Sequence, residues 1–167
     1  MLNSPQVQLR RKHRMSRFHS CDLRKGRVSE PGRIYHIRTS TATDRTLFRD
    51  ILLGRLVVHG LRFLHERGDV QSLAFVVMPN HLHWLVCLGN MQPLAGVMHS
   101  LKGHTAKAIN QRRGLTGETV WQSGYFDRAL RAEEDVRAIA RYIVANPLRA
   151  GLCRHIGDYP LWDAIWL

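Results

Sequence analysis

The stretch MPNHLHWLV, residues 78–86, indicates both the fold and a candidate site. It places His81 and His83 two positions apart in an otherwise apolar run. Because successive side chains of a β-strand point to opposite faces, both imidazoles project from one face. The other face carries Leu82, Trp84 and Val86. This pattern predicts a strand with one face in the core and, on the other face, a histidine pair able to hold one metal ion. A pair of solvated surface histidines is the alternative.

A second informative segment is ARYIVANPLRAGL, residues 140–152. Tyr142 and Asn146 are spaced i, i+4 and therefore share one face of a helix. Taken alone, each has a structural explanation, as a half-buried helix residue and as a helix stop before Pro147. Together with the histidine pair, they predict a phenol nucleophile and an amide ligand that meet at one site. Two imidazoles and one amide oxygen leave positions open for phosphate and water, a composition compatible with Mg²⁺ or Mn²⁺.

Apolar periodicity and turn residues predict the other elements. Strands are expected over residues 33–39, 72–78, 81–88 and 125–131. Helices are expected from Thr43-Asp44 to Gly68, over residues 93–111, and from the acidic residues 133–135 to about Asn146. Pro79-Asn80 separates two short apolar strands, which predicts a hairpin. The last helix is expected to end before Pro147, because the residue preceding a proline disfavours the helical conformation.

This order of elements predicts an α+β fold. Strand, helix, strand, strand, helix, strand is the split βαβ arrangement of ferredoxin-like antiparallel sheets, here followed by an added C-terminal helix that carries Tyr142. In such a sheet, two helices cover one face and the third strand is central. His81 and His83 are then expected on the open face. The added helix is expected to pack across that face and to bring Tyr142 opposite the histidines.

Composition and charge indicate a polyanionic partner. The chain has 167 residues, is 44% hydrophobic and carries a formal net charge of +12, with a pI near 10.8. Its basic residues are mostly arginine, whose guanidinium forks suit phosphate oxygens and stack on bases. Nucleic acid is therefore the favoured partner, and a charge that serves only solubility is the alternative.

The basic residues are concentrated at the N-terminus. Residues 1–30 contain Arg10, Arg11, Lys12, Arg14, Arg17, Arg24, Lys25 and Arg27, against only Asp22 and Glu30. With little apolar periodicity, this segment is expected to be a basic arm that orders on nucleic acid, or a solvated tail without a specific role. Residues 31–167 are expected to form a single domain.

The cysteines and the hydropathy bear on the cellular compartment. Cys21, Cys87 and Cys153 are odd in number and lack metal-like spacing, which favours a reducing cytosol. No apolar run approaches the roughly 18 residues of a membrane span, and the N-terminus lacks a signal-peptide core. We therefore expect a cytoplasmic protein without a membrane partner.

Five motifs in order give the chain a family resemblance: YHIRT at 35–39, VVMPNHLHWLV at 76–86, WQSGYFDRALR at 121–131, YIVANPLRAGL at 142–152 and DYP at 158–160. Over roughly residues 31–160 the chain resembles the REP-associated tyrosine transposases, bacterial and nucleoid-associated single-tyrosine HUH endonucleases with a ferredoxin-like or RRM-like sheet. The resemblance implies that His81 and His83 are metal ligands, that Tyr142 is the nucleophile, and that Asn146 is the third ligand.

The resemblance also touches positions with less defined roles. Lys102 resembles a basic position of the family and is a candidate DNA contact, as are Arg10, Arg11, Lys12 and Arg14 of the arm; a solvated helix face also explains Lys102. Trp121 is expected to pack in the core, and His36 and His104 match no family ligand position. The end of the chain, DYPLWDAIWL, lacks the serine-containing continuation usual in the family.

The activity implied by the resemblance is cleavage and rejoining of single-stranded DNA near palindromic hairpins, with a divalent metal, a 5′-phosphotyrosine and a free 3′-hydroxyl. One alternative is a hairpin-binding module on an RRM-like sheet that does not cut. A second is a replication initiator or relaxase with the same chemistry, although those proteins generally have larger chains. The sequence leaves open whether the protein is a monomer or a homodimer, and whether Tyr142 serves its own site or a partner's.

Overall fold

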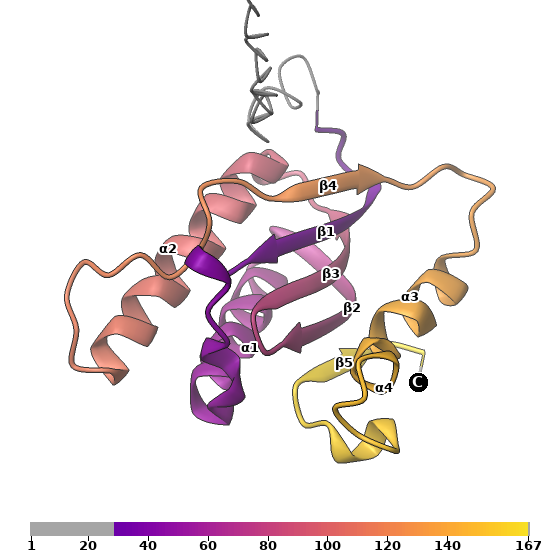
Figure 1. Cartoon of the computed structure of the whole chain (residues 1–167). Helices are drawn as coiled ribbons and strands as arrows, with labels where there is room; N and C mark the ends of the chain where they lie inside the picture. The colour runs from indigo at the N-terminus through magenta and orange to yellow at the C-terminus, as the bar shows by residue number, and fades with distance from the viewer. Residues whose placement is uncertain (1–28, 167) are drawn as a thin grey trace, which may run out of the picture.

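A five-stranded antiparallel sheet organises residues 29–166, the part of the chain that the computed structural model describes (Figure 1). Its strands are β1 Ile34–Ser40, β2 Val70–Met78, β3 His81–Leu88, β4 Phe126–Ala129 and β5 Trp162–Ala164. They lie in the order β4-β1-β3-β2-β5, and every pairing is antiparallel. The strand that carries the histidine pair is therefore central, as predicted.

Helices lie on both faces of this sheet. They are α1 Ile51–Glu66, α2 Leu94–Arg112, α3 Val136–Val144 and the short α4 Asn146–Arg149. Helices α1 and α2 cover one face, and α3 packs against the other (Figure 1). We call the face of α3 the open face, because α3 lies over β2, β5 and part of β3 and leaves β1 and β4 without a helix above them.

Alternation along β3 separates the two cores. Leu82, Trp84 and Val86 are fully buried in the core under α1 and α2, as predicted. The Trp84 indole donates a hydrogen bond to Ser72 Oγ at 2.9 Å, which satisfies its one polar atom. Leu85, on the opposite side of the same strand, packs with Ile143 of α3. His81 and His83 share the side of Leu85 and therefore lie on the open face.

Several local predictions are confirmed. Strand β2 turns directly into β3 through Pro79 and Asn80, which makes the predicted hairpin. Gly68 ends the α1 segment with φ of 76°, a conformation that residues with a Cβ rarely adopt. Trp121 is buried in the core, 5.3 Å from the Phe48 ring between centroids, and its indole donates to Thr105 Oγ1.

The predicted start of the first helix is wrong. Thr43 and Asp44 lie in a 3₁₀ turn, Ala42–Asp44, and both have φ of 55°, outside the helical region. A second 3₁₀ turn, Leu47–Arg49, follows before α1 begins. Asp50 is the residue that caps α1, because its carboxylate accepts a hydrogen bond from the Leu52 amide at 2.9 Å.

The C-terminal part agrees with the prediction in one respect and differs from it in others. Helix α3 ends at Val144, before Pro147, as predicted, but the short helix α4, which was not predicted, begins at Asn146 with Pro147 in its first turn, where a proline is tolerated. Strand β4 is only four residues long, shorter than the expected 125–131. A 3₁₀ turn, Ile156–Asp158, precedes β5, a fifth strand that the periodicity did not indicate.

Candidate active site on the open face

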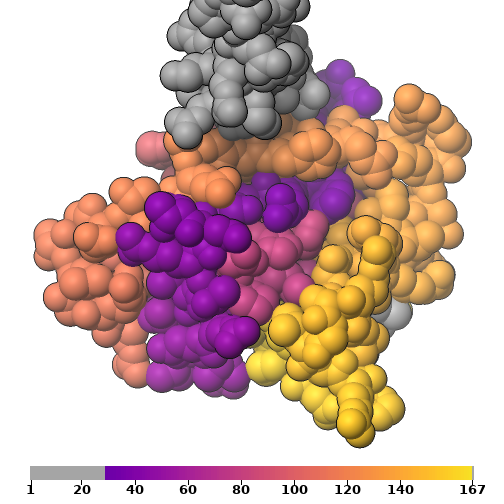
Figure 2. Space-filling model, in the orientation of Figure 1, coloured from indigo at the N-terminus to yellow at the C-terminus, as the bar shows by residue number. Residues whose placement is uncertain are grey.

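The strand register determines which side chains surround the histidine pair. On β1, Arg38 lies opposite His83 and Ser40 opposite His81, and directly opposed residues of antiparallel strands share a face. On β2, Val76 and Met78 take the corresponding positions and are buried. The pair therefore lies between a polar strand on one side and an apolar strand on the other. In Figure 2, magenta surface in the colour of β2 and β3 is open to view between the indigo segment and the yellow C-terminal segment.

Each histidine of the pair has its Nδ1 atom engaged. His81 Nδ1 is 2.7 Å from Asn80 Oδ1, and His83 Nδ1 is 3.2 Å from His36 Nε2. The rings of His81 and His83 meet edge to face, with centroids 4.9 Å apart. The Nε2 atoms of both rings make no hydrogen bond within the described residues, so these are the nitrogens available to a ligand.

Burial keeps these imidazoles neutral. It is the main cause that lowers the pKa of His81 to about 4, with a contribution from the Arg38 guanidinium. Burial also lowers the pKa of His83 to about 3, followed by the effects of His81 and His36. Neutral imidazoles are the form that binds metal ions, and at neutral pH neither ring needs to lose a proton first.

The low pKa values predict loss of stability in acid. An unfolded histidine protonates near its ordinary value of 6.5, whereas these two rings stay neutral down to about 4 and 3. Below pH 6.5 the unfolded chain therefore binds more protons, and the free energy of unfolding falls as the pH falls. We expect the urea midpoint to decrease from pH 7 to pH 5, and to decrease less in His83→Gln. His104→Gln, which makes the same change on the outer side of α2, is the matched control. If the urea midpoint decreases equally in the unchanged protein, in His83→Gln and in His104→Gln, the explanation is contradicted.

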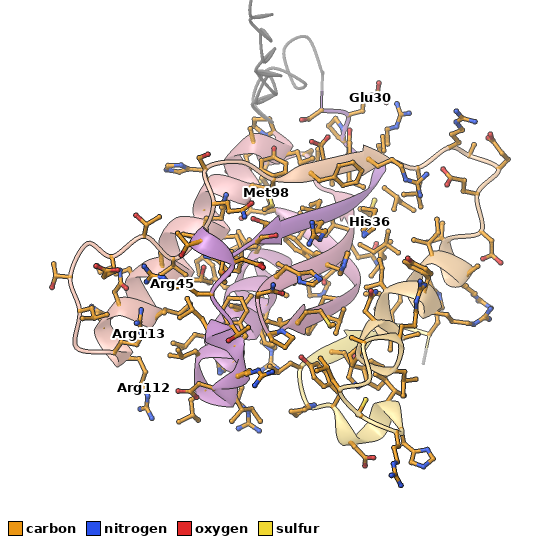
Figure 3. The ribbon with its side chains drawn as sticks, viewed as in Figure 1. Glu30, His36, Arg45, Met98, Arg112 and Arg113 are labelled. Atoms are coloured by element: carbon orange, nitrogen blue, oxygen red, sulfur yellow. The ribbon has the colours of Figure 1, made fainter. Side chains whose placement is uncertain are left out.

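His36 is a site residue that the sequence reasoning missed. It lies on β1 (Figure 3) and projects onto the open face. Its ring stacks on that of His83 with centroids 5.4 Å apart. Its pKa is lowered, first by burial and then by the charge of Arg128. The signal was present in YHIRT, because antiparallel pairing of β1 with β3 puts the even-numbered residues of β1, including His36, on the same face as His81 and His83; the prediction did not extend to strand pairing.

The half of the open face outside α3 carries arginine and aromatic side chains. Arg38 on β1 and Arg128 on β4 are exposed, and so is Phe126, which leaves 56% of its surface accessible. The Phe126 ring meets His36 edge to face at 6.5 Å. Arg128 also forms an ion pair with Glu134 at 2.6 Å. This surface combines positive charge with an exposed ring beside the histidine pair.

Tyr142 and Asn146 lie together where α3 passes into α4. Asp135 caps α3 by accepting hydrogen bonds from the amides of Arg137 and Ala138. The Tyr142 ring is about half exposed, and the Arg149 guanidinium lies over it, 4.3 Å from the centroid. The Asn146 amide group donates to the carbonyls of Tyr142 and Ile143 at 3.0 and 2.8 Å, which leaves Oδ1 as the atom free to act as a ligand.

Side-chain contacts and shared elements group the predicted site residues into two pairs. His81 and His83 share the open face, Tyr142 and Asn146 share a helix end, and within residues 29–166 no hydrogen bond or ring contact joins the pairs. Within the same residues, no group of three His, Cys, Asp or Glu side chains is placed to hold a metal ion. The donor set still fits one: two neutral imidazoles with free Nε2 atoms, and an amide oxygen as the third ligand.

The remaining predicted residues lie elsewhere. The Lys102 ammonium donates to the carbonyls of Gln122 and Gly124 at 2.5 and 2.9 Å, so it holds the loop before β4, and a DNA contact for it stays a prediction. His104 packs near Phe63 on the outer side of the helical layer, away from the histidine pair. The arm residues Arg10, Arg11, Lys12 and Arg14 lie outside the described residues. In the described part of the chain, no helix is long and apolar enough to cross a membrane.

Comparison with known proteins agrees with this fold. Residues 32–146 match the family described as Transposase IS200 like. A REP-associated tyrosine transposase of Escherichia coli (strain K12) is 28% identical over 87 residues, which are 52% of this chain and 50% of that protein. The chain thus spans about half the length of this curated relative.

A solved structure, that of a REP-associated tyrosine transposase bound to a REP hairpin, superposes with a TM-score of 0.65 at 20% identity, over 81% of this chain and 79% of that one. At this identity the likeness shows a shared fold. The family match is more informative, because residues 32–146 run from before β1 to the start of α4 and include the predicted nucleophile and the three predicted metal ligands. The chain belongs to the IS200-like transposase family.

Proposed function

We propose that this protein is a metal-dependent endonuclease and strand-transferring enzyme that acts on single-stranded DNA near palindromic hairpins. The observation that carries the proposal is the pair of neutral imidazoles on the open face, beside a sheet surface that bears arginines and an exposed phenylalanine. Residues 31–167 act as one catalytic domain, on a sheet whose first four strands have the ferredoxin-like order.

Tyr142 is the proposed nucleophile. Its phenol loses a proton to solvent, a bond forms between Oη and the scissile phosphorus, and the bond from phosphorus to the 3′-oxygen breaks. The leaving 3′-oxygen takes up a proton, and the downstream strand remains attached as a 5′-phosphotyrosine. Attack by a 3′-hydroxyl reverses the step, so rejoining or strand transfer needs no added energy source. The guanidinium of Arg149 over the ring restricts its orientation and adds a positive charge beside the phosphate.

His81, His83 and Asn146 are the proposed ligands of a divalent ion, Mg²⁺ or Mn²⁺. Such an ion, when bound, polarises the phosphate and neutralises the charge that develops on its oxygens. The chain itself contributes ligands that need no deprotonation at neutral pH, since burial keeps both imidazoles neutral. Asn146 contributes an amide oxygen whose orientation is fixed by the two hydrogen bonds of its nitrogen.

Single-stranded DNA is the proposed partner of the uncovered half of the open face. Arg38 and Arg128 can contact phosphates, and the exposed Phe126 ring can stack on a base, which is the combination used by sheets that bind single strands. The basic residues of the N-terminal arm, Arg10, Arg11, Lys12 and Arg14, are proposed to add phosphate contacts. A DNA hairpin is the proposed target, because a structural relative is described as bound to a REP hairpin, and hairpins around the gene for this protein are the first candidates.

The test is incubation of the protein with 5′- and 3′-labelled hairpin DNA from around its own gene, in Mg²⁺, in Mn²⁺ and with chelator. We expect the 3′-labelled fragment to become covalently attached to protein, the 5′-labelled fragment to be released with a free 3′-hydroxyl, and chelator to prevent both. Hairpin binding without a covalent product under either metal would overturn the proposal and favour the binding module.

A further inference from the structure

A chain of three side chains leads away from His81. Asn80, in the turn between β2 and β3, places its Oδ1 2.7 Å from His81 Nδ1. Its Nδ2 donates to Asp44 Oδ1 at 2.5 Å. Asp44 is distant in sequence, in the turn after β1. None of these contacts is needed to build the sheet, because the strands already pair through their backbones.

The chemistry of the three groups fixes the direction of every hydrogen bond. A carboxylate only accepts, so the Asn80 NH₂ group must face Asp44. The Asn80 oxygen must then face His81, and an amide oxygen also only accepts. His81 Nδ1 therefore carries the proton, and in a neutral imidazole the lone pair is left on Nε2. In a neutral His81 the tautomer is thus fixed by the Asp44 carboxylate through the Asn80 amide.

The turn that holds Asp44 adopts an unusual conformation. Thr43 and Asp44 both have φ of 55°, a region that residues with a Cβ occupy sparsely, and Thr is β-branched. The turn is tied to the hairpin by Thr41, whose amide donates to the Asn80 carbonyl at 2.8 Å and whose hydroxyl donates to the Arg45 carbonyl at 2.6 Å. The Arg45 guanidinium, labelled in Figure 3, in turn donates a hydrogen bond to Thr43 Oγ1. Consecutive left-handed residues held this way indicate a turn shaped to place a side chain.

We propose that Asp44 and Asn80 are positioning residues that present His81 Nε2 to the divalent ion. The inference rests on the proposed function for the identity of His81 as a metal ligand. Metal-binding histidines in proteins generally donate their second ring N–H to a neighbouring acceptor, which fixes the ring and its tautomer. Here the acceptor is an amide, and a carboxylate from another segment fixes the orientation of that amide.

The test uses Asn80→Ala and Asp44→Asn, with Asp50→Asn as the matched control. Asp50 lies in the same connection but caps α1, and asparagine also caps helices well. The tautomer of His81 is measured on the metal-free protein, from the ¹⁵N and ¹H correlations of its ring by NMR. The affinity for Mn²⁺ is measured separately by titration, from the electron paramagnetic resonance signal of free Mn²⁺.

In the unchanged protein and in Asp50→Asn we expect the Nδ1–H tautomer of His81. In Asn80→Ala we expect the Nε2–H tautomer to become populated and the Mn²⁺ dissociation constant to rise about 10- to 100-fold. In Asp44→Asn, the amide of Asn80 is free to turn over, so a mixture of tautomers and a smaller rise are expected. Because Asp44 is exposed, this variant keeps the test valid if Asn80→Ala does not fold.

The outcomes separate this inference from the proposed function. If the unchanged protein binds Mn²⁺ and the Asp44→Asn variant keeps both the Nδ1–H tautomer and the affinity, the positioning role is overturned. If the unchanged protein shows the Nδ1–H tautomer but binds no Mn²⁺, the proposed metal site fails instead. A change of tautomer together with weaker Mn²⁺ binding in folded variants supports the inference.

Discussion

Replacing Tyr142 by phenylalanine is expected to abolish the covalent protein–DNA product, with a loss of at least about 10³-fold in the rate of adduct formation, because no other group takes the place of a removed nucleophile. The change deletes one oxygen from a ring that is half exposed and leaves the stacking of Arg149 intact. Hairpin binding and the thermal midpoint should therefore stay near their original values. Denaturing gels of the 3′-labelled hairpin reaction give the measurement.

Tyr159→Phe is the matched control for this prediction. Tyr159 donates a hydrogen bond to the Val77 carbonyl at 2.7 Å, and burial, followed by the effect of Cys153, raises its pKa to about 12. Its phenol therefore keeps its proton and serves structure. Tyr159→Phe should lower stability by about 1 kcal/mol through the lost hydrogen bond and leave adduct formation in place. An adduct that persists in Tyr142→Phe and disappears in Tyr159→Phe would reverse the two assignments.

Mixing two inactive variants decides which site Tyr142 serves. In the described residues no hydrogen bond or ring contact joins Tyr142 to the histidine pair, and α3 lies over β2, β5 and part of β3. A mixture of Tyr142→Phe with a variant that lacks the histidine pair regains activity only if the tyrosine of one copy works with the histidines of another. Activity that stays absent in the mixture assigns both pairs to one copy of the chain.

Replacing His83 by alanine is expected to lower the rate of metal-dependent cleavage by about 10²- to 10⁴-fold, the equivalent of several kcal/mol of lost charge stabilisation. The substitution removes one of two neutral nitrogen ligands and also frees His36, whose Nε2 contacts His83 Nδ1. Hairpin binding should remain, because the proposed phosphate contacts come from arginines. Cleavage rates and Mn²⁺ binding are measured on the same preparation.

His104→Ala provides the control for this second prediction, because it makes the same change on the outer side of α2, where the ring contacts Phe63. It should leave cleavage and Mn²⁺ binding unchanged. Cleavage that survives in His83→Ala at the original rate and with the original metal dependence would remove the histidine pair from the mechanism.

The start of the first helix shows where local sequence signals mislead. Thr43 and Asp44 have the side chains of a helix cap, yet Asp44 is 36 residues from its partner Asn80 and uses its carboxylate there. Asp50 has the same chemistry and caps the helix. Nothing within the segment distinguishes the two aspartates, since the difference lies in the β2–β3 turn that tertiary folding brings beside one of them.

Strand β5 illustrates the same limit. Residues Trp162–Ala164 are too few to give a periodic signal, and they pair with β2 because that strand has a free edge after β3 has occupied the other one. Pairing places Ala164 opposite Ala74 in the core beneath α3. The position of α3, and with it Tyr142, therefore depends partly on a strand that the sequence did not indicate.

The sequence by itself determined the alternation of β3, the hairpin, the order of the first six elements and the face on which His81 and His83 lie, because these features depend on side-chain period and turn residues that are local. Tertiary structure alone decided that His36 and Arg38 lie beside the histidines and that Asp44 reaches Asn80. These contacts join segments up to 47 residues apart, and their register is set by strand pairing across the whole sheet, which no local pattern encodes.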